Sequence, residues 1–188
     1  MANICVYCGA ANNLAAKYVE CARETGTLIA QRGHTLVYGG ANRGLMGEAA
    51  RATHAYGGKV IGVIPQALVD LEQAYREADE LHITDGLRER KAILESRADG
   101  FMIIPGGLGT LDELFEVLTL RQLRVHDKPI VIVDLDGYYQ PLLRLIEHLH
   151  AEGFVKETYK LMFEMVPDPL SGIKAIEDYK PIDIGSRF

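Results

Sequence analysis

Glycine recurs in three short segments that each follow an apolar run. They are residues 8–10 (Cys-Gly-Ala), 39–47 (Gly-Gly-Ala-Asn-Arg-Gly-Leu-Met-Gly) and 105–110 (Pro-Gly-Gly-Leu-Gly-Thr). Because glycine has no Cβ, a ligand can approach its backbone N–H closely, and a helix that begins behind such a turn adds unpaired N–H groups and positive dipole potential. If the three turns meet at one edge of a sheet, they predict a crevice for a small anion, most plausibly a phosphate.

The common nucleotide-binding fingerprints are absent. The sequence has no G-x-x-x-x-G-K-[ST] motif, and none of the three turns spells G-x-G-x-x-G. These absences argue against a Walker-type NTPase and make a dinucleotide-binding oxidoreductase a lower-ranked alternative.

Two cations interrupt the inward face expected of a helix over residues 87–98. Leu87 and Leu94 have core-facing spacing, and Arg90 and Lys91 stand three and four positions after Leu87. Either this face is basic and solvated, with snorkelling side chains, or Arg90 points into the crevice and clamps a phosphate or carboxylate. The spacing leaves both interpretations open.

Glu113 follows Thr110 by three residues, which is the spacing of a capping box. One interpretation is therefore a helix N-terminus capped by these two side chains. The other is a functional carboxylate, kept ionised by the helix N-terminus and by a nearby Arg90. An ionised Glu113 suits the stabilisation of a cationic transition state or the activation of water better than general-acid work.

Other residues with potential chemistry favour structural roles. Cys5 and Cys8 form a C-x-x-C inside an apolar run and are interpreted as buried, because a redox pair needs a helix N-terminus and zinc needs more ligands. His148 and His150 point to different sides of one helix. The D-x-D at residues 134–136 could hold Mg²⁺, but carboxylates at a strand end usually close a turn. We predict a site without metal or cofactor.

Short apolar runs alternate with longer segments of helical period, which predicts an α/β fold: a Rossmann-like three-layer sandwich with a mostly parallel sheet and helices on both faces. The predicted strands cover residues 4–8, 35–38, 59–64, 101–104 and 129–133, with weaker ones at 81–83 and 161–165. The predicted helices cover residues 14–32, 45–56, 87–98, 110–124, 139–151 and 170–179. In a parallel sheet the three glycine turns fall on the same edge.

Length and charge narrow the functional classes. The 188 residues suit a single nucleotide-binding domain over 1–188. The 20 Lys and Arg against 26 Asp and Glu give a net charge of −6, which is the wrong sign for a general nucleic-acid binder. Without a basic leader or a long apolar stretch, we expect a cytoplasmic protein with no membrane partner.

The segment 105–113 matches the motif PGGxGTxxE, and with it the sequence resembles the LONELY GUY (LOG) family of cytokinin riboside 5′-monophosphate phosphoribohydrolases, many of whose members were once labelled possible lysine decarboxylases. Arg90-Lys91 resembles the family's RK pair at a matching distance upstream, and residues 38–47 resemble its YGG(G/A)xxGLMG turn. Ala10 stands where many members have serine, Ala41 where many have a third glycine, and Leu87 where methionine is common.

The resemblance implies a Rossmann-like homodimer that hydrolyses the N-glycosidic bond of adenosine 5′-monophosphates, N6-modified or plain, to free base and ribose 5-phosphate. It implies that Arg90 and Glu113 are catalytic. It also implies a set of residues that bind substrate or phosphate: Gly9, Gly39, Gly40, Gly44, Met46, Glu72, Lys91, Gly106, Gly107, Leu108, Gly109, Thr110, Asp112 and Thr119.

Cleavage of this bond develops positive charge at the anomeric carbon, which a fixed carboxylate such as Glu113 would stabilise. A non-catalytic nucleotide carrier or sensor on the same fold is the alternative. A pyridoxal-phosphate decarboxylase ranks far behind, because no lysine is singled out for a Schiff base.

Overall fold

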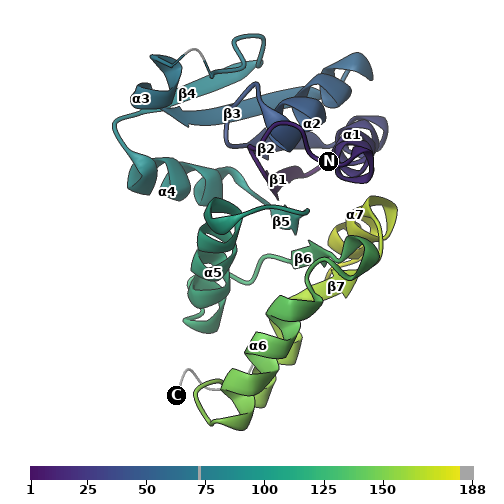
Figure 1. Cartoon of the computed structure of the whole chain (residues 1–188), viewed down its shortest axis with the longest axis vertical. Coiled ribbons are helices and arrows are strands. Elements are labelled where there is room, and N and C mark those ends of the chain that lie inside the picture. The colour runs from purple at the N-terminus through teal and green to yellow at the C-terminus, as the bar shows by residue number, and fades with distance from the viewer. Residues whose placement is uncertain (72, 183–188) are drawn as a thin grey trace.

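A single parallel sheet of seven strands, in the order β4-β3-β2-β1-β5-β6-β7, forms the centre of the molecule, and helices pack on both of its faces (Figure 1). The computed structural model describes residues 1–71 and 73–182. The strands are β1 Asn3–Tyr7, β2 Thr35–Tyr38, β3 Lys59–Pro65, β4 Glu80–Thr84, β5 Gly100–Ile103, β6 Ile130–Val133 and β7 Glu164–Val166. The predicted Rossmann-like α/β class is confirmed.

Seven α-helices and two short 3₁₀ helices connect these strands within the described residues. The α-helices are α1 Ala16–Gln31, α2 Gly44–Ala55, α3 Gln66–Val69, α4 Leu87–Arg97, α5 Leu108–Gln122, α6 Gln140–Ala151 and α7 Pro169–Glu177; the 3₁₀ helices are η1 Leu135–Gly137 and η2 Glu157–Leu161. The short α3 was not predicted. The strand predicted at 161–165 is displaced, because Leu161 ends η2 and β7 begins at Glu164.

Successive strand residues point to opposite faces of the sheet, and each face has its own core. Ile4 and Val6 of β1 pack with α1, α2 and α7, whereas Cys5 and Tyr7 pack with α4, α5 and α6. Both sets are buried, which explains why the strands read as continuous apolar runs. No helix among the described residues has the length and apolar character needed to cross a membrane.

The strand order reverses beside β1, so that β2 pairs with it on one side and β5 on the other. Ligands bind at such a switch point in open α/β sheets, because the loops after the two central strands diverge there. The Gly9 N–H donates to the Pro105 carbonyl at 3.1 Å, and the Leu45 N–H donates to the Gly9 carbonyl at 3.0 Å. The fold therefore brings parts of all three glycine turns together.

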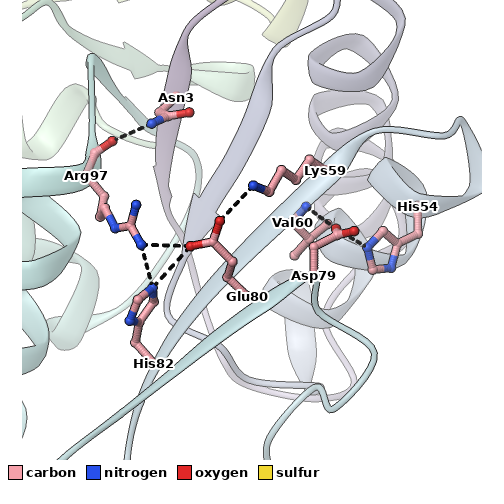
Figure 2. A network of polar contacts seen from close by, with 8 residues as sticks. All are labelled: Asn3, His54, Lys59, Val60, Asp79, Glu80, His82 and Arg97. Carbon is pink, nitrogen blue, oxygen red and sulfur yellow. Dashed lines mark hydrogen bonds and ion pairs between the residues drawn. The ribbon is translucent and has the colours of Figure 1, made fainter.

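Charged side chains join the edge strand β4 to its neighbours (Figure 2). Glu80 accepts from Lys59 and from Arg97, each at 2.7 Å, and His82 lies 2.9 Å from the same Arg97 nitrogen. Next to them, Asp79 accepts from the Val60 N–H at 2.8 Å. These contacts fix the edge strand to β3 and α4.

Close packing of α1 on α2 depends on Gly26, since a Cβ there would meet the Ala49 carbonyl and the Thr53 hydroxyl of α2. We expect Gly26→Ala to lower the free energy of unfolding by about 1 to 3 kcal/mol through overpacking, as measured by urea denaturation. Gly109→Ala is the matched control, because it lies in α5 with no heavy atom within 4 Å of the added Cβ. Alanine should stabilise that helix by about 0.5 to 1 kcal/mol, and equal stabilities of the two variants would contradict this view of the packing.

Candidate active site

A cavity of about 310 Å³ opens beside the switch point of the sheet. Its lining residues are Cys8, Gly9, Ala10, Ala11, Met46, Leu68, Leu87, Arg90, Gly107, Gly109, Thr110 and Glu113. The first and third glycine turns thus face one hollow, as predicted. The second turn contributes Met46 to it, while Gly44 lines a neighbouring hollow of about 190 Å³.

Arg90 and Glu113 form a buried ion pair in the wall of this cavity. Arg90 Nη1 lies 2.7 Å from Glu113 Oε1, and the two residues are 7% and 5% exposed. Arg90 Nε also donates to the Val63 carbonyl at the end of β3, at 3.0 Å. Among the described residues, no hydrogen bond is formed by Arg90 Nη2, which lies against Gly39, or by Glu113 Oε2.

The inward position of Arg90 decides between the two interpretations of its helix. Leu94 and Arg90 are the buried residues of α4, whereas Leu87 is 62% exposed at the cavity mouth. The expectation that Leu87 faces the core was therefore wrong. Lys91 lies on a neighbouring face, where its ammonium pairs with Asp112 at 3.0 Å and Glu116 at 2.8 Å and so ties α4 to α5.

The capping-box interpretation of Thr110 and Glu113 is wrong, because α5 begins earlier than expected. Gly107 is the N-cap residue and no side chain caps the helix, so Glu113 lies in the second turn. The N–H groups of Leu108, Gly109 and Thr110 have no hydrogen-bond partner among the described residues. Three free donors at a helix N-terminus beside the cavity form a ready site for an anion.

Burial raises the pKa of Glu113, and the Arg90 guanidinium opposes that shift. The sequence-based expectation placed this carboxyl at a helix N-terminus that would favour its charge. The structure instead places it one turn deeper, where loss of hydration is the larger effect and Arg90 is the main group that favours the charged form.

Several glycines of the candidate set make room for protein atoms. A Cβ at Gly39 would collide with the Arg90 guanidinium, and one at Gly106 would collide with the Thr110 side chain. Gly40 and Gly44 have positive φ angles of 74° and 53°, and each packs closely against neighbouring backbone. By contrast, Gly107 and Gly109 have open space beside them and line the cavity.

Two further candidates, Leu108 and Thr119, lie apart from the cavity lining. Leu108 is exposed, and the hydroxyl of Thr119 donates to the Phe115 carbonyl on the exposed face of α5. Glu72 lies outside the described residues. Sequence reasoning missed Leu68 and Ala11, which do line the cavity. The apolar Leu68 follows β3 directly in a segment without glycine, so no local signal marked it.

The other potential reactive groups have structural roles. Cys5, Cys8 and Cys21 are free, buried thiols, and burial raises the pKa of Cys21 to about 12. Asp134 accepts from the Tyr139 N–H at 2.6 Å and so closes a turn, as predicted. Within residues 1–71 and 73–182, no group of three or more His, Cys, Asp or Glu side chains is arranged to hold a metal ion.

Comparison with known proteins identifies the family. The family model described as possible lysine decarboxylase matches residues 46–176. The cytokinin riboside 5′-monophosphate phosphoribohydrolase LOG of Oryza sativa subsp. japonica is 41% identical over 178 residues, which cover 95% of this chain and 74% of that protein. This chain belongs to the LOG family. LOG3 of Arabidopsis thaliana, named as the same enzyme, is 38% identical over 178 residues, covering 95% of this chain and 83% of the relative.

Solved structures share the fold of this LOG family member at low sequence identity. The molybdenum cofactor binding protein of Rippkaea orientalis superimposes with a TM-score of 0.72 at 22% identity, covering 94% of this chain and 95% of that one. The molybdenum cofactor carrier protein of Chlamydomonas reinhardtii has a TM-score of 0.72 at 24% identity, covering 94% and 96%. At this identity the likeness establishes the fold alone.

Removing Arg90 leaves the buried Glu113 without its cation. We expect Arg90→Ala to lower the free energy of unfolding by about 3 to 5 kcal/mol, the usual cost of breaking a buried pair from one side, as measured by chemical denaturation at neutral pH. Arg88→Ala on the exposed face of the same helix is the control and should change stability by less than about 0.5 kcal/mol. Similar losses in both variants would show that the pair is not a buried interaction.

Proposed function

We propose that this protein hydrolyses the N-glycosidic bond of adenosine 5′-monophosphates, N6-modified or plain, and releases the free base and ribose 5-phosphate. The observation that carries the proposal is the Arg90–Glu113 pair. It lies in the wall of the cavity, next to the unpaired N–H groups at the start of α5. The substrate class follows the LOG relatives, whose names specify a cytokinin riboside 5′-monophosphate.

The 5′-phosphate binds at the N-terminus of α5 in this proposal. The free N–H groups of residues 108–110 supply donors, the helix dipole favours the anion, and the bare Gly107 and Gly109 admit it closely. Binding energy at the phosphate then holds the ribose in place beside the reacting groups. The apolar side chains of Met46, Leu68 and Leu87 form the part of the cavity that suits a base.

Glu113 acts on the anomeric carbon of the bound nucleotide. As the bond from C1′ to the base breaks, the electron pair leaves with the base, and C1′ becomes cationic. The free Oε2 of a Glu113 carboxylate stabilises that charge and orients the attacking water, whose oxygen bonds to C1′ while a proton is transferred to the departing base. Arg90 fixes Oε1 and offers its free Nη2 donors to the phosphate or to the base.

Further parts of the proposal concern the setting of the reaction. We propose a cytoplasmic homodimer that takes a nucleoside 5′-monophosphate as its partner and binds neither nucleic acid nor membranes. The excess of acidic residues supports the part about nucleic acid.

Glu113→Gln tests the role of the carboxylate. We expect kcat for AMP to fall by at least about 10²-fold, because the amide cannot neutralise the developing charge, while the Kd for AMP changes little. Release of adenine and ribose 5-phosphate, followed by chromatography, measures the first, and calorimetry measures the second. Near-normal turnover would exclude Glu113 as the catalytic group. Tight binding of AMP by the wild-type protein without any turnover would instead favour a carrier or sensor.

The raised pKa of Glu113 predicts the pH at which the hydrolysis of AMP slows in acid. Only the ionised carboxylate can stabilise the cation, so kcat/KM should fall as the pH drops through the pKa of Glu113 in the free enzyme. Because burial raises this pKa above the ordinary 4.5, the fall should begin at a higher pH than for an exposed glutamate. A pH profile of AMP hydrolysis, with circular dichroism confirming the folded state at each pH, checks this. A constant kcat/KM down to pH 4.5 would contradict it.

A further inference from the structure

Two adjacent tyrosines that do not line the cavity contact the backbone of the glycine turn that precedes α5. The hydroxyl of Tyr139 donates to the Ile104 carbonyl at 2.9 Å, and the hydroxyl of Tyr138 donates to the Gly106 carbonyl at 2.8 Å. The carbonyl between them, that of Pro105, accepts from the Gly9 N–H at 3.1 Å. Three consecutive carbonyls of this turn are therefore each held by a different donor from outside the segment.

Because a peptide group is planar, a hydrogen bond to its C=O also fixes the direction of its N–H. In a trans peptide the C=O and the following N–H point in opposite directions. The hydrogen bond from Tyr138 to the Gly106 carbonyl consequently turns the Gly107 N–H away from Tyr138. Gly107 is a residue that lines the cavity.

The tyrosines are themselves fixed by the turn after β6. Asp136 and Gly137 adopt left-handed backbone conformations, with φ angles of 51° and 77°, and Asp134 accepts from the Tyr139 N–H. The rings of Tyr138 and Tyr139 meet edge to face with their centroids 4.9 Å apart. Tyr139 is buried, and Tyr138 also packs edge-on against Tyr18 of α1. This support holds both hydroxyls in place before a ligand arrives.

We propose that Tyr138 is a positioning residue for the phosphate, which orients the Gly106–Gly107 peptide so that its N–H and the N–H groups at the start of α5 converge on one anion, while Tyr139 anchors the backbone before the turn through the Ile104 carbonyl. The inference rests on the proposed function and adds to it the residues that preorganise the phosphate site. Neither tyrosine lines the cavity, so each acts through the backbone. A turn that hydrogen bonds already hold can bind phosphate without reordering its backbone, which lowers the free-energy cost of binding.

Tyr138→Phe is the sharper test, because this side chain is partly exposed and its hydroxyl makes one hydrogen bond within the described residues. We expect the Kd for AMP, measured by calorimetry in the slow Glu113→Gln background, to rise about tenfold, as the loss of one well-placed hydrogen bond does. The Kd for adenosine, which lacks the phosphate, should change by less than about twofold, and the KM for AMP should rise more than kcat falls. Tyr139→Phe should raise the Kd for AMP less than Tyr138→Phe does, because the peptide that Tyr139 holds continues into Pro105 and carries no N–H.

Tyr56→Phe is the matched control, since this exposed tyrosine makes no hydroxyl hydrogen bond with any described residue. It should leave both dissociation constants and the melting temperature unchanged. A merely structural role of Tyr138 would lower the melting temperature and leave the ratio of the two dissociation constants as it was, which would overturn the inference. An unchanged Kd for AMP in Tyr138→Phe would also overturn it. Failure of the wild-type protein to release adenine would count against the proposed function alone, because the binding measurements do not depend on turnover.

Discussion

The buried pair of Arg90 and Glu113 is the interaction on which the site depends. Taking two charges out of water is expensive, and their attraction offsets that cost only when the geometry is good and the remaining donors are satisfied. Three separate segments supply the geometry: α4 carries the guanidinium, α5 the carboxylate, and the end of β3 the Val63 carbonyl, while Arg90 Nη2 and Glu113 Oε2 have no partner among the described residues. Gly39 after β2 leaves the space that the guanidinium occupies. The site is therefore a property of the assembled sheet.

The glycines in these turns have two different roles: some make room for protein side chains, and others line the cavity. Gly39 and Gly106 accept the close approach of Arg90 and Thr110, which are cavity residues themselves, so these glycines act on the site through other side chains. Gly107 and Gly109 face open space, where a missing Cβ benefits only something that enters from outside. The sequence pattern does not distinguish these two kinds of glycine, whereas the positions of the neighbouring atoms do.

Sequence reasoning predicted those parts of the fold and site that local pattern controls. The apolar runs of β1, β2 and β5 and the glycine turns behind them follow from burial on both faces of a sheet and from turn geometry. It could not decide between a solvated and an inward Arg90, because that depends on the contacts of α4 with β3 and α5. It misplaced the start of α5 because the Thr110 and Glu113 spacing imitates a capping box. It also missed the raised pKa of Glu113, since desolvation is set by residues far away in the chain.

The charged cluster on β4 has a consequence for how the molecule behaves among copies of itself. An edge strand offers unpaired N–H and C=O groups to any extended chain nearby. Here β4 carries Glu80 and His82, which contact Lys59 of β3 and Arg97 of α4 (Figure 2), and charged side chains on an edge strand make it a poor template for another strand. At the opposite edge, β7 spans only three residues, which is too short a template for stable pairing. Both edges of the sheet are thus poor templates for strand addition, which leaves the loop edge at the carboxyl ends of the strands as the face where this fold meets another molecule.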